Sequence, residues 1–209
     1  METLVRLRET DELGDFLEKA SWHSSGIELD ITDMGEDEYR EMALELEKGS
    51  LPVRSLHYGR TENVSMQEWE LFESQLEKVK ERAEKLGCQV ISVAPPRAEV
   101  NESHTVKDLQ DFMEEADSYA RSADLELCFL MDGFMKDPEM VNTAFRDLDS
   151  PSIGVMVDLS RIVDGLDPVT LLQKMDVQVR KIILPVPLEE IGEHLGEMDD
   201  EIMVVAERI

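Results

Sequence analysis

The sequence predicts an α/β protein of the (β/α)8 type, in which eight parallel strands close into a barrel covered by helices. Short apolar, β-branched segments alternate with longer amphipathic segments along the chain, and there are eight of the short segments. The first of them continues into RETDEL without a glycine-rich phosphate-binding turn, which disfavours the alternative, an open doubly wound sheet. The 209 residues suit a single domain, interpreted here as residues 1–209.

Each candidate strand is a short apolar run bounded by polar or turn residues. In chain order the runs cover residues 4–8, 26–31, 53–59, 88–95, 125–133, 153–159, 179–186 and 201–208. The last run ends almost at Ile209, so the barrel is expected to lack the final helix.

The clearest helical pattern lies between the third and fourth strands, where apolar residues recur every three or four positions over residues 66–86 and Gly87 ends the helix. A second pattern covers residues 106–120, with Thr105 as the N-cap. The pairs Asp137–Pro138 and Asp167–Pro168 each indicate a further helix start, because a capping side chain followed by proline favours the first turn.

The composition is strongly acidic, with 21 Lys and Arg against 48 Asp and Glu, a formal net charge of −27. Repulsion therefore disfavours nucleic acid and anionic membranes as partners, and the surface is of a halophilic type suited to a salty cytoplasm. No signal peptide or membrane-spanning run is recognisable, so a cytoplasmic location is expected. Cys88 and Cys128 lie in strand-like runs and are expected to be buried free thiols.

In such barrels the functional site lies at the carboxyl ends of the strands. Charged residues and a histidine gather there in the predicted strands, and arginines among them suit a phosphate or carboxylate group. They are Arg8, Glu28, Asp30, His57, Arg60, Arg97, Asp132, Lys136, Asp158, Arg161, Glu207 and Arg208.

Several of these residues have two interpretations. Asp158 is either a site carboxylate or the cap of a turn, with Arg161 as its surface partner. Glu28, in the middle of IELDI, is either buried with a cationic partner or a functional carboxylate that points inward, since an unpaired buried carboxylate is too costly. His57 is the best candidate for proton transfer, because histidine titrates near neutrality.

The order GIELDI, SLHYG, EKLGCQVISVAP and IGVMVDL resembles the xylose isomerase-like barrels, which include the sugar phosphate isomerase/epimerase and endonuclease IV families. The resemblance implies a divalent metal held by strand-end carboxylates and a histidine, and proton transfer between adjacent sugar carbons. On that resemblance, Asp158 corresponds to the sixth-strand aspartate, His57 to the third-strand histidine and Glu207 to the final-strand glutamate.

The sequence departs from this family at the metal site. Leu130 stands near the place of the fifth-strand glutamate, with Asp132 two residues later on the same strand face. Arg161 replaces the histidine that follows the sixth-strand aspartate, and VRKIILPVP in the seventh strand offers no ligand. A divalent metal is therefore not favoured. The Arg161 guanidinium beside Asp158 is a candidate to replace the positive charge of the metal. The remaining candidate metal ligands are His57, Asp132, Asp158 and Glu207.

Two functional hypotheses remain open. In the first, the chain is a sugar phosphate isomerase or epimerase that acts on a small anionic polyol. Its candidate catalytic residues are His57, Glu28, Asp158 and Glu207, and its candidate ligand-binding residues are Arg60, Arg97, Asp132 and Arg161. In the second, the barrel has lost the chemistry and only binds or senses a ligand. An endonuclease IV-like activity is disfavoured by the acidic charge.

A homodimer is also expected from the missing final helix. By period-two alternation the last strand turns Ile202, Val204 and Ala206 outward, where no following helix would cover them. A two-fold contact through this face would bury the apolar residues of both copies.

Overall fold

The computed structural model describes residues 2–7, 20, 24–97, 105–132, 137–148, 150–159, 174–187 and 202–208. The strands in this part are β1 (Glu2–Leu7), β2 (Gly26–Asp30), β3 (Val53–Tyr58), β4 (Val90–Val93), β5 (Glu126–Leu130), β6 (Ile153–Asp158), β7 (Val179–Pro187) and β8 (Met203–Arg208). The helices are α2 (Glu36–Leu46), α3 (Trp69–Leu86), α4 (Thr105–Ala123), α5 (Pro138–Ala144) and the short 3-10 helix η1 (Gly59–Asn63).

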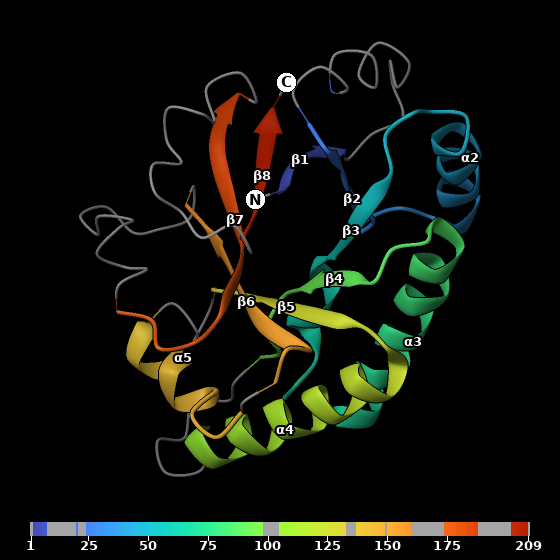
Figure 1. Ribbon diagram of the computed structural model, residues 1–209. Coiled ribbons are helices and arrows are strands. Elements are labelled where there is room, and N and C mark those ends of the chain that lie inside the picture. The colour runs from blue at the N-terminus through green and yellow to red at the C-terminus, as the bar shows by residue number, and fades with distance from the viewer. Residues whose placement is uncertain are drawn as a thin grey trace.

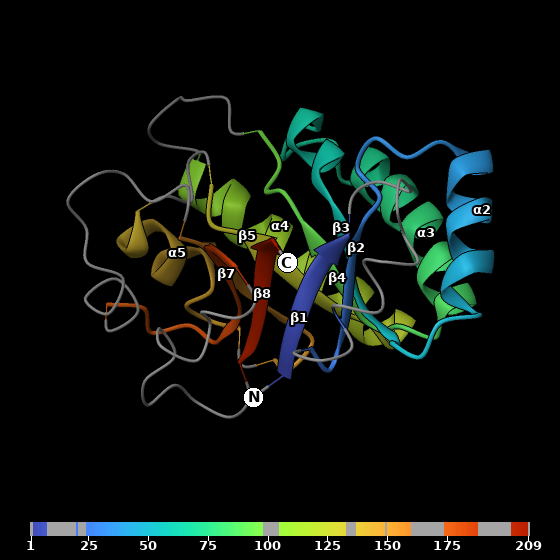
Figure 2. The same cartoon turned by 90° about the horizontal axis from the view of Figure 1, so that it is seen from above.

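The eight strands form a closed barrel in the order of the sequence, and every neighbouring pair is parallel (Figure 1). Closure is made by β1 and β8, which lie side by side with Glu2 opposite Met203 (Figure 2). The fold class predicted from the sequence is therefore confirmed, and the doubly wound alternative is wrong. All carboxyl ends of the strands lie at one end of the barrel, which from here on is called the mouth.

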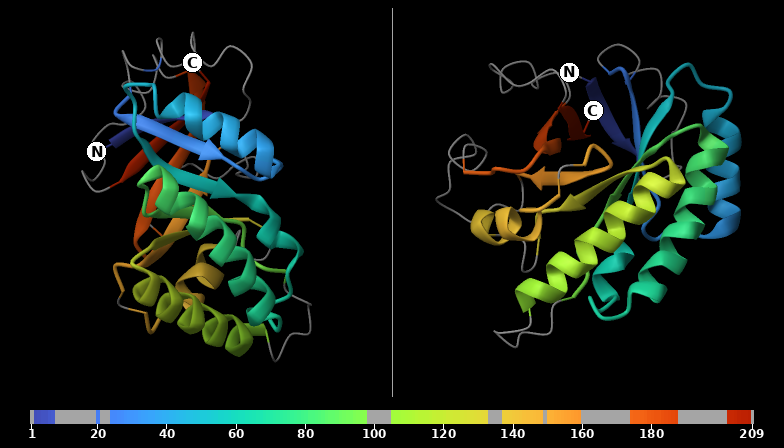
Figure 3. Two further views of the ribbon diagram at one scale, coloured as in Figure 1. Left: turned by 90° about the vertical axis from the view of Figure 1, so that its right-hand side faces the viewer. Right: turned by 60° about the horizontal axis from the view of Figure 1, so that its bottom comes forward.

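The helices α2, α3 and α4 lie along one side of the barrel, and α5 packs beside α4 (Figure 3). The predicted stripe of α3 is buried at Phe72, Leu76, Val79 and Ala83, and Gly87 ends the helix with the left-handed φ of 68° that glycine tolerates. Among the described residues, no helix has both the length and the apolarity needed to cross a bilayer.

The helix start predicted at Asp137 is also confirmed. Its side chain accepts a hydrogen bond from the backbone nitrogen of Glu139 at 3.0 Å, and Pro138 occupies the first turn of α5. The corresponding prediction at Asp167–Pro168 lies outside the described residues.

Apolar residues form two separate cores because strand side chains alternate between the two faces of the barrel wall. The outer core lies between the strands and the helices, and its aromatic residues pack edge to face, with the Phe72 and Phe112 rings 4.8 Å apart. The inner core fills part of the barrel itself. Its members are Leu4, Cys128, Leu130, Met156, Ile183 and Val205.

The outward face of the last strand, β8, is covered. Val204 and Ala206 are fully buried members of the outer core within a single chain, and Ile202 is partly buried against the same core. The prediction of an exposed apolar face on β8 is therefore wrong. Alternation identified the outward residues correctly, but the prediction assumed that only the preceding helix could cover them. The homodimer inferred from that face loses its support.

Candidate functional site

His57 lies at the mouth, one residue before the end of β3, and faces the inside of the barrel. Its neighbour Leu56 belongs to the outer core, so alternation turns Ser55 and His57 inward. The His57 side chain is buried, and its Nδ1 atom has no hydrogen-bond partner among the described residues. Asp30, the last residue of β2, is its register partner on the neighbouring strand. A buried ring nitrogen without a partner is a place where a ligand atom could complete a hydrogen bond.

One layer deeper, the inside of the barrel holds a cluster of charged and hydroxyl side chains, here called the buried ion network. Glu28 is its centre: one carboxylate oxygen accepts hydrogen bonds from Nε of Arg6, at 2.8 Å, and from Nη2 of the same residue. The other oxygen accepts from Ser55 Oγ at 3.1 Å and from Lys181 Nζ at 2.5 Å. Lys181 also donates to Ser55 Oγ and to Ser92 Oγ. Of the two interpretations of Glu28, the structure gives the buried carboxylate with cationic partners.

This network sets the charges of the residues around it. Burial alone would raise the pKa of Glu28. The positive charges of Arg6 and Lys181, with a smaller contribution from His57, outweigh burial, so the pKa lies well below its usual range. Burial and the Arg6 charge, opposed by Glu28 and Asp30, lower the pKa of His57 to about 4. At neutral pH Glu28 is therefore ionised and His57 is neutral.

The opposite half of the barrel interior is apolar. Leu130 on β5, Met156 on β6, Ile183 on β7 and Val205 on β8 are all buried and belong to the inner core. Burial raises the pKa of the Cys128 thiol, in the same core, to about 12, so the thiol stays protonated. Apart from Leu4 on β1 and the strand-end residue Asp158 on β6, the interior is thus divided into a polar half, formed by β1 to β4 with Lys181, and an apolar half formed by β5 to β8.

Asp158 ends β6 at the mouth and is buried at 4 % exposure. Alternation turns it inward, because Val157 beside it belongs to the outer core. Asp132 follows β5 at the same end of the barrel and is partly buried. The prediction that Asp158 and His57 lie at the same end is confirmed. Glu207 belongs to β8, but its side chain lies outside the described part, as does the whole of Arg161.

Arg60 and Arg97 lie on the rim of the mouth and are exposed. Arg60 is the second residue of η1, after Gly59. It forms an ion pair of 3.3 Å with Asp33, which lies in the loop after β2. The backbone of Arg97 donates to Val64 O at 2.6 Å and accepts from Met66 N at 3.2 Å, which joins the loops after β3 and β4. A buried hydrogen bond of 2.7 Å from Thr61 Oγ1 to Ala94 O fixes η1 to the end of β4. This side of the rim is therefore tightly braced.

Sequence reasoning missed four members of the buried ion network: Arg6, Ser55, Ser92 and Lys181. Period-two alternation alone would have placed Arg6 beside Leu4 and Lys181 beside Ile183 on the inner face. The sequence could not indicate that a lysine on the seventh strand reaches a glutamate on the second.

The described residues do not fit a divalent metal at the mouth. No three His, Cys, Asp or Glu residues among them are grouped so as to hold an ion. On β6, Asp158 faces inward at the mouth. On the two strands beside β6, the inner face carries the apolar residues Leu130 and Ile183. Catalytic metal sites usually need three or more protein ligands.

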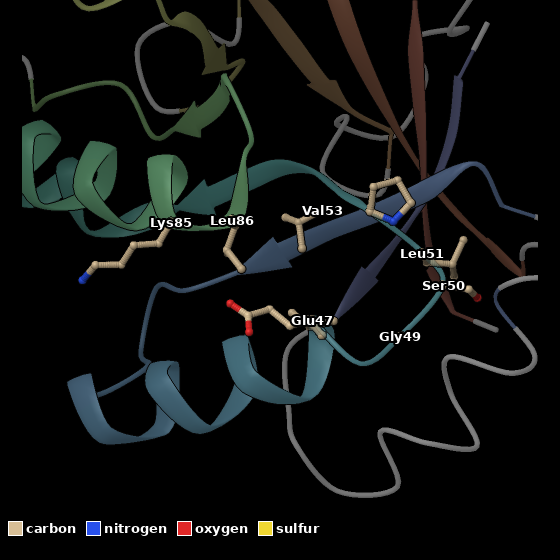
Figure 4. A pocket seen from close by; sticks show the side chains of 9 residues that line it. Glu47, Gly49, Ser50, Leu51, Val53, Lys85 and Leu86 are labelled. Carbon is tan, nitrogen blue, oxygen red and sulfur yellow. The ribbon is translucent and has the colours of Figure 1, made fainter.

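A hollow lies at the opposite, amino end of the barrel. It is an open cavity of about 470 Å³ between the last turns of α2 and α3 and the start of β3, lined by Glu47, Leu51, Lys85 and neighbouring residues (Figure 4). No charged side chain that lines it is buried, since both Glu47 and Lys85 are exposed. The mouth, with its buried polar groups, is the better candidate site.

Comparison with known proteins supports the fold. No family model matches the sequence, and no curated protein matches it. Among solved structures, a D-tagatose 3-epimerase-like protein aligns over all of this chain and 92 % of its own, with a TM-score of 0.72 and 14 % identity. A probable 3-DHS dehydratase, AsbF from Bacillus anthracis, aligns over all of this chain and 93 % of its own, with a TM-score of 0.71 and 12 % identity. The IOLI protein, solved with a binding zinc atom, aligns over all of this chain and 89 % of its own at a TM-score of 0.68 and 15 % identity.

The TM-scores show that these structures share the fold of this chain, which is a closed barrel of parallel strands. The chain therefore has the xylose isomerase-like TIM-barrel fold, as the sequence resemblance implied. At this level of identity, substrate and activity have to be argued from the residues of the mouth.

Proposed function

We propose that the chain is an isomerase/epimerase-like barrel that binds a small anionic polyol, such as a sugar phosphate, at the mouth. The observation that carries this proposal is the buried, neutral His57, whose Nδ1 has no partner among the described residues. A neutral imidazole in this position would exchange a hydrogen bond with a hydroxyl or carbonyl oxygen of the ligand. The ligand's own oxygen would then satisfy the ring nitrogen that the described residues leave unpaired.

Proton transfer in such a reaction needs a base and a group that polarises the carbonyl. With a pKa of about 4, His57 is a weak base and suits the second task, as a hydrogen-bond donor to the carbonyl oxygen. Asp158, inward and buried at the mouth, is the candidate base. In an isomerisation, the proton would leave the carbon next to the carbonyl, pass to the carboxylate and return to the former carbonyl carbon, while the hydroxyl proton of the first carbon moves to the carbonyl oxygen. In an epimerisation, a proton would return to the opposite face of the first carbon. Neither reaction consumes an oxidant or a reductant.

The anionic group of the ligand would be held at the rim. Arg60 and Arg97 stand there on neighbouring loops and are both exposed to solvent. Guanidinium groups bind phosphate through paired hydrogen bonds, which adds direction as well as charge. The bracing of these loops by Thr61 and by the Ser65–Arg97 bridge would keep the two arginines in place.

A second candidate, a barrel that binds a ligand without transforming it, is favoured by one specific observation. Glu28, a candidate for proton transfer, is fully buried, and both of its carboxylate oxygens already accept hydrogen bonds from Arg6, Ser55 or Lys181, so it is not available to take a proton from a ligand. Among the described residues this leaves few acid–base groups at the mouth.

The two candidates can be separated in two steps. A thermal-shift screen of aldose and ketose phosphates should find a ligand that stabilises the wild type, and this stabilisation should fall in His57→Gln but not in Arg40→Gln, an exposed control on α2. Incubation of that ligand in deuterated water, followed by proton NMR, should then show exchange at the carbon next to the carbonyl. Binding without exchange supports the second candidate, and the absence of any stabilising polyol contradicts both.

A further inference from the structure

Lys181 crosses the inside of the barrel. Its Cα belongs to β7, whereas the three acceptors of its ammonium group belong to Glu28 on β2, Ser55 on β3 and Ser92 on β4. In a ring of eight strands, β3 stands opposite β7. The side chain therefore spans the barrel and places a positive charge on the far wall, below the mouth.

The ammonium group is fully satisfied and fully enclosed. A lysine has three N–H donors, and each has one acceptor here. The side chain has no exposed surface. Its charge is therefore a fixed feature of the interior, held by a carboxylate and two hydroxyl groups, and not a mobile surface charge.

Below Asp158 at the mouth, the described inner face of β5 to β8 carries the apolar residues of the inner core. Leu130, Met156, Ile183 and Val205 fill it with apolar side chains, on the strands where the family resemblance places most metal ligands. On this side of the barrel, Leu130 and Ile183 place hydrocarbon on the inner faces of β5 and β7, and Asp158 remains as a buried carboxylate at the end of β6. On the other side, the ammonium group of Lys181 supplies a cation.

We propose that Lys181 is a built-in cation that takes the place of a divalent metal in this barrel, so that the chain folds and binds its ligand without one. Lys181 would act as a positioning residue: it does not reach the ligand, but it holds Glu28, Ser55 and Ser92 beneath His57 and gives the floor of the mouth its positive charge. The statement about the ligand rests on the proposed function, whereas the statement about the metal does not.

The first test is made on the wild-type chain, purified without chelator and without added metal. Elemental analysis should find magnesium, manganese, iron, cobalt and zinc well below one ion per chain, and EDTA should leave the melting temperature unchanged. About one bound ion per chain, with a melting temperature that falls in EDTA and recovers with that ion, would overturn the proposal.

The second test replaces the cation. Lys181→Met keeps the length of the side chain and removes its charge, and it should lower the melting temperature by roughly 10 °C. The exposed Lys174→Met should change it little. Combining Lys181→Met with Glu28→Gln should cost less than the sum of the single changes, because the two groups are partners. Strict additivity would contradict a direct role, and if Lys181→Met does not fold, the metal and EDTA measurements decide alone.

The third test connects the cation to the ligand. If the screen finds a stabilising sugar phosphate, its thermal shift should be the same with and without EDTA, and it should be smaller in Lys181→Met than in Lys174→Met. A shift that requires a divalent ion would refute the proposal. If no sugar phosphate binds, the proposed function fails, while elemental analysis still decides whether the barrel is independent of metal.

Discussion

The ammonium nitrogen of Lys181 lies 2.5 Å from Oε2 of Glu28 inside the barrel, although 153 residues separate the two in the sequence. Both side chains are fully buried. Removing one member of a buried ion pair leaves an uncompensated charge, which is far more costly than losing a surface pair.

Glu28→Gln should therefore destabilise the chain by about 3–5 kcal/mol, because Arg6 and Lys181 lose the carboxylate that both of them contact. Urea unfolding followed by circular dichroism measures the change. Glu45→Gln is the control, since it removes the carboxylate of an exposed pair with Lys48 and should cost at most about 1 kcal/mol. Equal effects of the two substitutions would show that the buried network contributes no more than a surface contact.

The same pair makes a prediction about pH. Because the folded pKa of Glu28 is lowered, the carboxylate contributes stability above its ordinary pKa of 4.5, and this contribution is lost as the pH falls through the folded pKa. The difference in unfolding free energy between wild type and Glu28→Gln should therefore be constant from pH 8 to about pH 5 and shrink in more acidic solution. A difference that grows on acidification would contradict the assigned charges.

His57 should titrate with a pKa of about 4, which NMR of its ring protons can measure directly. The folded pKa lies below the ordinary value of 6.5, so the unfolded chain takes up the proton first and stability falls as the pH drops from 6.5 to 4. A shift of this size corresponds to stability on the order of 3 kcal/mol. His57→Gln should remove this part of the pH dependence. The other three histidines of the chain supply the comparison, and a His57 pKa near 6.5 would contradict the burial of the ring.

Thr61→Val should weaken the rim of the mouth. The substitution preserves the shape of the side chain but leaves Ala94 O without its donor in a buried position, at a cost of about 1–3 kcal/mol. The matched control is Thr143→Val, which removes an equally short but exposed bond to Glu139 O on α5. If the rim arginines bind the ligand's anion, Thr61→Val should also reduce the thermal shift by a sugar phosphate. Two variants of equal stability would argue against a braced rim.

Salt should stabilise this protein. A net charge of −27 makes the folded chain repel itself, and the range of that repulsion falls from about 10 Å in 0.1 M salt to about 3 Å in 1 M salt. The melting temperature should therefore rise between 0.1 and 2 M potassium chloride, most steeply at the low end. A melting temperature that is flat or falls over this range would remove the basis for the halophilic interpretation.

The fold could be predicted because its signal is local. Each strand is an apolar run such as IGVMVDL, and α3 carries its buried stripe at intervals of three and four residues. Because strand segments and helix segments alternate along the chain, the sequence predicts a parallel barrel. The end of the barrel at which His57 and Asp158 lie follows from the direction of parallel strands. None of these inferences needs to know which side chains meet.

The buried ion network could not be predicted in the same way, because its contacts join residues that are far apart in sequence. Glu28 alone indicated that a cation must be near, but any of the 21 lysines and arginines could have supplied it. The burial of Val204 and Ala206 was missed for a similar reason: the sequence shows which face of β8 is apolar, but not what packs against it.

The division of the barrel interior also has a consequence for synthesis. Apart from Leu4, the inner face of the first four strands carries mainly polar side chains, which would remain hydrated while the chain is incomplete: Arg6, Glu28, Ser55, His57 and Ser92. The apolar inner face appears later, from Cys128 onward, and Lys181 later still. A nascent half-barrel would therefore present a mainly polar inner surface, which should lower its tendency to aggregate on the ribosome. The hydrocarbon wall emerges only when the other half is already available to enclose it.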